Sequence, residues 1–269
     1  MRCATWRGRL RSIMWGDHGV RGRRAIFISC AAILAGCAGA PLRRDAAVPA
    51  PDVGREAFVA GTSVEGREIP CVVLGGGPDV CMIIATIHGN EAAGTPLVHR
   101  LEREVLIRPE LLSGRCLVLV SVANPDGMAT NRRTNVNGVD LNRNFPADSF
   151  RPTRRHGPRP LSEPESRVLR DLVYRYNPDR VVSIHQPVAC VDWDGPGEGL
   201  ARAMSGLSGL QAKRIGSLPG SFGSWVGLAL GRPIITLELP RSADALDDDA
   251  SWDRYGAMLV QALVWPRRL

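Results

Sequence analysis

The chain has 269 residues, of which 44% are hydrophobic and 23% are charged, which is typical of a globular protein and argues against a largely disordered one. The formal net charge is +7, but residues 1–36 carry seven arginines against one acid, Asp17, so the remainder carries only +1. Because most of the net positive charge lies in that segment, the composition does not indicate a nucleic-acid partner.

Residues 1–36 have the pattern of a lipoprotein signal peptide. Arg23-Arg24 precedes an apolar run, 25–35, which is shorter than the roughly 20 residues that a transmembrane helix needs. Small residues then lead directly into Cys37, as in a bacterial lipobox; the alternative is an ordinary signal peptide followed by a coincidental cysteine. We therefore expect a cell-envelope protein, anchored to the membrane by lipid on Cys37, with its folded domain in the periplasm.

Residues 37–55 lack hydrophobic periodicity and are predicted to form a flexible tether, followed by a single domain over 56–269. Four cysteines fall in this domain, and the sequence does not decide their pairing: Cys71, Cys81, Cys116 and Cys190. They lack the close spacing of a structural zinc site, so buried small side chains are the default interpretation.

Apolar runs alternate with amphipathic stretches along the domain. Strands are predicted at 70–74, 80–87, 116–123, 180–184 and 233–239, and helices at 94–107, 162–176, 198–207, 221–230 and 251–263. Ser162 and Glu165 are predicted to form a capping box at the start of the second helix, with Pro164 in its first turn. The alternation predicts an α/β fold with a mixed, largely parallel β-sheet flanked by helices on both faces.

The predicted strand 80–87 ends in His88, and Glu91 follows three residues later. Both side chains can turn toward one point if the chain bends, and Gly89 permits a bend. Imidazole nitrogen and carboxylate oxygen are good zinc ligands, although His-x-x-Glu alone occurs often by chance.

Two further strands carry polar residues within apolar runs. Strand 180–184 is followed by His185, which taken alone is more often a hydrogen-bonded core or turn residue than a ligand. Strand 233–239 contains Glu238, and a buried carboxylate needs a cation, a metal-bound water or an arginine nearby. An internal salt bridge is the alternative interpretation of Glu238.

Polar residues also cluster between 124 and 146, in Asn-Pro-Asp-Gly and then Arg-x-Asn-x-x-Gly-Val-Asp-Leu-Asn-Arg-Asn-Phe. Taken alone, this segment is a turn-rich surface loop. In order along the chain, these motifs and the His88, His185 and Glu238 stretches together resemble the zinc carboxypeptidase family over about residues 61–240. The stretches 185–190 and 219–225 are similar to those of the bacterial murein peptide amidases within it.

The resemblance implies one zinc ion per chain, bound by His88, Glu91 and His185. It further implies hydrolysis of a peptide or amide bond by a zinc-activated water, with Glu238 as general base and Arg133 as oxyanion stabiliser. Asn142 and Arg143 are then expected to bind a substrate carboxylate. The implied substrate is a small peptide, a murein tripeptide cleaved at its γ-D-glutamyl–diaminopimelate bond. The resemblance supplies no role for Asp140.

Two departures accompany the resemblance. Residues 214–220 contain no tyrosine where digestive carboxypeptidases carry one on a mobile loop, and Gln186 stands where the amidases carry Asp. Asp192 and Asp194 could meet a substrate amino group or be plain turn residues. The alternatives in function are a general metallocarboxypeptidase acting on α-linked peptides and a catalytically inactive peptide-binding lipoprotein.

Overall fold

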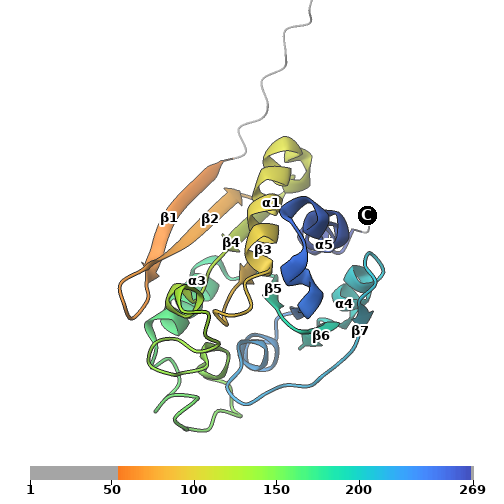
Figure 1. Ribbon diagram of the computed structural model, residues 1–269. Helices are drawn as coiled ribbons and strands as arrows, with labels where there is room; N and C mark the ends of the chain where they lie inside the picture. The colour runs from red at the N-terminus through yellow and green to blue at the C-terminus, as the bar shows by residue number, and fades with distance from the viewer. Residues whose placement is uncertain (1–53, 268–269) are drawn as a thin grey trace, which may run out of the picture. The chain divides into compact units, whose positions relative to one another are not determined.

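The computed structural model describes residues 54–267, which form an eight-stranded mixed sheet with helices on both faces (Figure 1). Cys37 and the predicted signal peptide lie outside these residues. The strands are β1 (Arg55–Thr62), β2 (Glu68–Gly75), β3 (Asp79–Ala85), β4 (Arg115–Val120), β5 (Arg180–His185), β6 (Val188–Asp194), β7 (Gln211–Ala212) and β8 (Ile234–Pro240). The helices are α1 (Gly94–Ile107), α2 (Pro125–Ala129), α3 (Pro164–Tyr176), α4 (Glu198–Ser205) and α5 (Asp248–Val264).

The strand order is β1-β2-β4-β3-β5-β8-β6-β7, and the four inner strands β4, β3, β5 and β8 are mutually parallel. β2 pairs antiparallel to β4, and β6 pairs antiparallel to β8. The prediction of a mixed, largely parallel α/β sheet is confirmed. Because β3, β5 and β8 are parallel neighbours, their carboxyl ends meet at one edge of the sheet.

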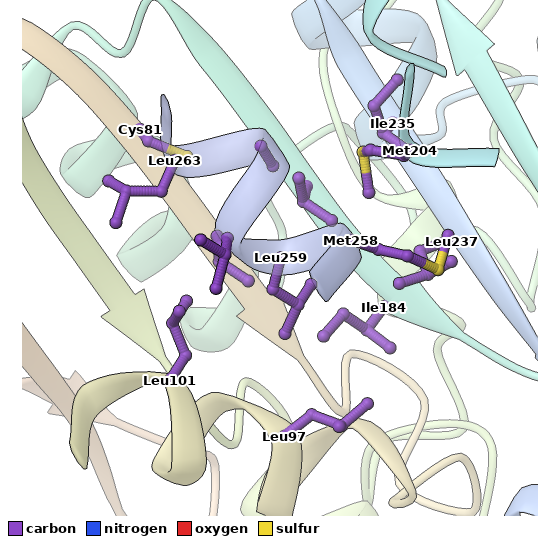
Figure 2. Close-up of a cluster of buried hydrophobic side chains, with 14 of the residues drawn as sticks. Cys81, Leu97, Leu101, Ile184, Met204, Ile235, Leu237, Met258, Leu259 and Leu263 are labelled. Atoms are coloured by element: carbon purple, nitrogen blue, oxygen red, sulfur yellow. The ribbon is translucent and has the colours of Figure 1, made fainter. Parts of the chain in front are cut away.

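Side chains alternate across the sheet and build one hydrophobic core on each face. Along β3, Cys81 and Ile83 face one core while Met82 and Ile84 face the other. The first core is covered by α1, α5 and α4, and Figure 2 shows Leu97 and Leu101 of α1 with Leu259 of α5 in it. The second core is covered by α3 together with Phe145, Phe222 and Trp225. This packing is what holds the strand ends in place.

The predicted elements are found with shifted boundaries. The first helix matches its predicted range, whereas the helix predicted over 221–230 is a π-helical turn, Ser224–Ala229. β1, β6 and β7 were not predicted from the sequence; β1 is half exposed at the sheet edge, and its apolar pattern is correspondingly weak. Within the described range, 54–267, no helix is long and apolar enough to cross a membrane.

The predicted capping box at α3 is wrong. The helix begins at Pro164 with Glu163 as its N-cap residue, and no side chain caps it. Glu163 instead accepts hydrogen bonds from the side chains of Asn135 (2.7 Å) and Asn137 (2.8 Å), and Glu165 accepts one from Asn135. The two acids are therefore used to fasten the 131–146 loop, a tertiary role that outweighs capping.

Candidate active site

Three parallel strands deliver the predicted site residues to one edge of the sheet. His88 follows β3, His185 ends β5, and Glu238 lies on β8 directly opposite His185 in the strand register. The strand order β3-β5-β8 places these three ends side by side. The grouping follows from parallel pairing, because residues at equivalent strand ends then share an edge.

The turn after β3 is fixed by a close backbone contact. A Cβ atom on Gly89 would lie 2.0 Å from the backbone carbon of Gly127, so only glycine fits there. On the other side of the contact, Asn124 accepts a hydrogen bond from Gly127 N and donates one to Ile87 O. Gly89 is thus needed for close approach rather than for an unusual φ angle, and the residue with positive φ in this turn is Thr86 (φ 54°).

The side chains of His88, Glu91 and His185 converge on one point. Glu91 Oε2 lies 2.8 Å from His88 Nδ1 and 3.0 Å from His185 Nδ1, and the two Nδ1 atoms are 3.2 Å apart. All three residues are buried. Tetrahedral zinc with bonds of about 2.0–2.1 Å requires ligand atoms roughly 3.3 Å apart, so this donor set fits a zinc ion.

Electrostatics keep Glu91 ionised in this buried position. Burial raises its pKa, but the hydrogen bonds and charges of His185 and His88 outweigh burial and leave the pKa well below its usual range. Burial lowers the pKa of His88, and the hydrogen bonds and charges of Asp140 and Glu91 reverse that effect and raise it. A charged carboxylate among imidazoles is what a divalent cation needs as a ligand set.

Asp140, for which the sequence offered no role, holds two site residues. Its Oδ1 lies 2.9 Å from His88 Nε2, and its Oδ2 accepts a hydrogen bond from Arg133 Nε at 3.0 Å. Ser183 Oγ lies 2.9 Å from His185 Nε2 in the same way. Groups that bind the distal nitrogen of a histidine orient its ring and fix its tautomer. Asp140 lies in the Gly-Val-Asp motif, but the residue that it contacts, His88, is 52 positions away along the chain. The sequence alone therefore did not reveal this contact.

Arg133 lies beside the converging donors. Its Nη1 donates to Glu91 Oε1 at 2.7 Å, and its side chain is one-third exposed. Nη2 makes no hydrogen bond to the described part of the chain, so it can donate to a bound molecule.

Asn142 and Arg143 belong to a short 3-10 helix, Leu141–Arg143, which Asp140 caps through the backbone N–H of Asn142. Asn142 Oδ1 accepts a hydrogen bond from Phe222 N at 2.9 Å, which ties this loop to the 218–224 segment. Burial lowers the pKa of Arg143, partly offset by Asp140. Its guanidinium nevertheless remains charged at neutral pH, because arginine is effectively always protonated in proteins.

A cavity of about 220 Å³ joins these groups, and the seven residues predicted for the site all line it: His88, Glu91, Arg133, Asn142, Arg143, His185 and Glu238. A second cavity, of about 350 Å³, shares Glu91 and Arg133 with the first and extends toward Asn131 and Arg241. The two cavities are thus neighbours that also share Gln186 and Pro187, and Arg143 lines the first only.

Gln186 is buried next to the converging donors, and its side chain links Ala93 to Asp244. It donates from Nε2 to Asp244 Oδ1 (2.9 Å) and accepts at Oε1 from Ala93 N (3.2 Å). Its backbone N–H also reaches Glu91 Oε2 at 3.2 Å. An aspartate here could not donate to Asp244, so the amide at 186 is matched to the acid at 244.

The interpretation of Asp192 and Asp194 as turn residues is wrong. Both lie on β6, both are buried, and both line the first cavity. The segment without tyrosine, 214–220, also lines it, through Ile215, Gly216 and Leu218. This side of the cavity could not be predicted from the sequence, because β6 lacks a continuous apolar run.

Comparison with known proteins places the chain among zinc peptidases. A model of the zinc carboxypeptidase family matches residues 53–191. Murein peptide amidase A of Escherichia coli K12 is 31% identical over 243 residues, which cover 81% of this chain and 96% of that protein. Gamma-D-glutamyl-L-diamino acid endopeptidase 1 of Lysinibacillus sphaericus is 25% identical over 69% of this chain and 61% of its own length.

Solved structures of zinc carboxypeptidase-like proteins are also similar to this chain. The murein-tripeptide amidase of Escherichia coli O157 superposes with a TM-score of 0.60 and 29% identity, over 79% of this chain and 93% of that one. Carboxypeptidase A of Helicoverpa armigera gives a TM-score of 0.66 at 19% identity, over 80% of this chain and 70% of that one, a likeness of fold alone.

Proposed function

Since the chain belongs to the zinc carboxypeptidase family, we propose that it hydrolyses the γ-D-glutamyl–diaminopimelate bond of murein peptides. The observation that carries this proposal is the convergence of seven polar side chains on one cavity, in a chain that is 31% identical to a murein peptide amidase. A zinc-dependent peptidase activity follows from family membership; the substrate and the residue roles are our proposal.

His88, Glu91 and His185 would hold the zinc ion, one per chain. A zinc ion bound there supplies a Lewis acid that polarises a carbonyl group and lowers the pKa of water. Asp140 and Ser183 position the two imidazole rings, so that Nδ1 of each faces Glu91.

Glu238 acts as the general base. Its Oε2 accepts a hydrogen bond from Val188 N at 3.2 Å, and within residues 54–267 its Oε1 accepts none, which leaves that oxygen for the attacking water. Glu238 then returns the proton to the leaving nitrogen, so the same carboxyl group serves first as base and then as acid.

Arg133 stabilises the negative charge that develops on the carbonyl oxygen. Two of its nitrogens are held by Glu91 and Asp140, so the guanidinium is fixed before the substrate binds and Nη2 can donate to the oxyanion without reorganisation of the side chain. A preorganised donor of this kind contributes about 10²- to 10³-fold to kcat.

Asn142 and Arg143 bind the carboxylate of the leaving residue, for which the planar guanidinium suits a two-point contact. The scissile bond would then lie beside His88, Glu91 and His185, with the leaving diaminopimelate in the first cavity and the glutamyl side toward the second. A general carboxypeptidase would bind the C-terminal carboxylate of an α-linked peptide through the same two residues, Asn142 and Arg143. The linkage that is cleaved must therefore be tested directly.

The test is mass spectrometry of L-Ala-γ-D-Glu-meso-diaminopimelate incubated with the purified protein. We expect release of free diaminopimelate by the zinc form, none by metal-stripped protein, and at least about 10²-fold slower release by Glu238→Gln, which keeps the shape of the side chain. Glu110→Gln, a change of an exposed and distant acid, is the matched control.

Trimming of an α-linked peptide with the γ-linked peptide left intact would replace the proposal by a general carboxypeptidase. If neither substrate is cleaved although zinc is bound, the protein is a peptide-binding protein with an inactive peptidase fold.

We further propose that the protein is anchored in the bacterial cell envelope by lipid on Cys37, with the peptidase domain in the periplasm. The support is the lipobox-like stretch before Cys37 and the basic, then apolar, segment ahead of it. The full chain should fractionate with membranes, and Cys37→Ser should move it to the soluble fraction. Equal distribution of both proteins would contradict the anchor.

A further inference from the structure

Two carboxylates in the first cavity have no part in the mechanism above. Asp192 and Asp194 lie on β6, which pairs with β8, and Asp192 is opposite Thr236 in the strand register. On both strands the alternate residues Val191, Trp193 and Leu237 face the hydrophobic core. Asp192 and Asp194 therefore point to the opposite face, the one on which Glu238 lies, and both line the cavity.

Both acids are buried, and neither has a positively charged partner in the described part of the chain. Asp192 is 6% exposed and Asp194 is 5% exposed. Asp192 Oδ1 accepts a hydrogen bond from Ile215 N at 2.8 Å, and Asp194 Oδ1 accepts one from Ser217 Oγ. The backbone N–H of Trp193 also contributes a hydrogen bond to the Asp192 carboxylate. In the described range no hydrogen bond reaches Asp194 Oδ2, and no lysine, arginine or histidine forms an ion pair with either residue.

Two buried carboxylates without a counter-ion are costly, and the cost is lowered when a cation enters the site. Burial raises the pKa of Asp192, and the charges of Asp194 and Glu238 raise it further. The negative charge of Asp192 and Asp194 therefore favours binding of a positively charged group of a ligand in this cavity.

Arg143 lines the same cavity. A molecule that pairs with both kinds of charge has a carboxylate for Arg143 and an ammonium group for the two acids. The volume of about 220 Å³ lies below the roughly 300–1,000 Å³ of drug-sized pockets, so the cavity is suited to a single amino-acid residue. A residue with a free α-carboxylate and a side chain that ends in an ammonium group has this charge pattern.

We propose that Asp192 and Asp194 form an acidic subsite that binds the side-chain ammonium group of a diamino acid on the leaving side of the scissile bond. This inference rests on the proposed function, to which it adds the residues that select the leaving amino acid. It implies that diaminopimelate and lysine are accepted and that an aliphatic residue of the same length is not.

The competing explanation is that the two acids only fasten the 213–219 segment, through Ile215 N and Ser217 Oγ. Asp192→Asn and Asp194→Asn separate the two explanations. An asparagine oxygen can still accept the same hydrogen bond, so the segment stays fastened while the negative charge is removed.

The experiment measures kcat/KM of the full-length protein for L-Ala-γ-D-Glu-L-Lys and L-Ala-γ-D-Glu-L-norleucine, which differ only in the terminal ammonium group. We expect the unmodified protein to prefer the lysine peptide by at least about 30-fold, a fold-change that corresponds to about 2 kcal/mol. Each Asn variant should reduce that preference at least about 10-fold while cleavage of the norleucine peptide changes less than about 3-fold. Glu110→Gln is the control and should keep the full preference.

A parallel fall for both peptides in both variants would show that the acids only support the 213–219 segment and would overturn the proposal. So would the absence of a preference in the unmodified protein. If no γ-linked peptide is cleaved at all, the proposed function fails. The subsite is then tested with L-Ala-L-Ala-L-Lys and L-Ala-L-Ala-L-norleucine, and the same ratios decide it.

Discussion

Asp140 offers the sharpest test of how the side chains proposed to bind zinc are positioned. Its carboxylate bridges His88 Nε2 (2.9 Å) and Arg133 Nε (3.0 Å), and it also caps the 3-10 helix that carries Asn142. Burial raises the pKa of Asp140, but the hydrogen bond and charge of His88 outweigh burial and hold the pKa far below its usual range. The carboxylate is therefore charged throughout the neutral pH range.

Asp140→Asn removes this charge with almost no change in shape. The amide oxygen can still accept from His88 Nε2, but the amide nitrogen then faces Arg133 Nε, donor against donor. Loss of a carboxylate behind a metal-binding histidine typically costs 10- to 100-fold in metal affinity, or about 1.4–2.7 kcal/mol. We expect a weakening of zinc binding in this range and a further loss of kcat from the displaced guanidinium of Arg133.

Zinc affinity would be measured by competition with a chromophoric chelator, and kcat separately at saturating zinc. Asp171→Asn on α3, where the aspartate is exposed and pairs with Arg170, is the matched control and should leave both quantities unchanged. If Asp140→Asn binds zinc as tightly as the unmodified protein, Asp140 does not position His88 and the reasoning from the structure is refuted.

Other predictions concern substrate binding, the thiols and the core. Arg143→Met should lower kcat/KM about 30- to 150-fold through the loss of a charged hydrogen bond worth about 2–3 kcal/mol, with zinc content, read by atomic absorption, unchanged; an unaltered kcat/KM would remove Arg143 from the substrate site. The thiols in the described range should react with a thiol reagent at about pH 8 only after unfolding, because burial raises the pKa of Cys71 to about 12 and those of Cys81 and Cys190 to about 11. Since these folded pKa values exceed the ordinary 9.0, stability should fall as pH rises above about 9, and a flat pH dependence of urea unfolding there would contradict this. Leu259→Ala, at a fully buried position of α5, should cost about 2–5 kcal/mol in the free energy of unfolding measured in urea, and a cost below about 1 kcal/mol would mean that the core between α1 and α5 is loosely packed.

The sequence by itself determined the fold class and the set of residues that meet at the site. Strands 80–87, 180–184 and 233–239 were recognisable because they are apolar on both faces, and each carries a polar residue at or near its end. Those signals are local, since a strand buried on both faces needs a continuous apolar run and a polar residue next to it stands out. The order of the motifs along the chain then indicated the family and, through it, the set of site residues.

Only the tertiary structure decided which residues support the site and which residues line its cavity. Asp140 reaches His88 across 52 positions, and Glu163 fastens Asn135 instead of capping its own helix. β6 could not be predicted because its exposed start and its two acids break the apolar pattern, and its insertion next to β8 turns Asp192 into the cavity. Contacts of this kind depend on strand order, and strand order is set by how helices and loops pack over the sheet rather than by any local run of residues.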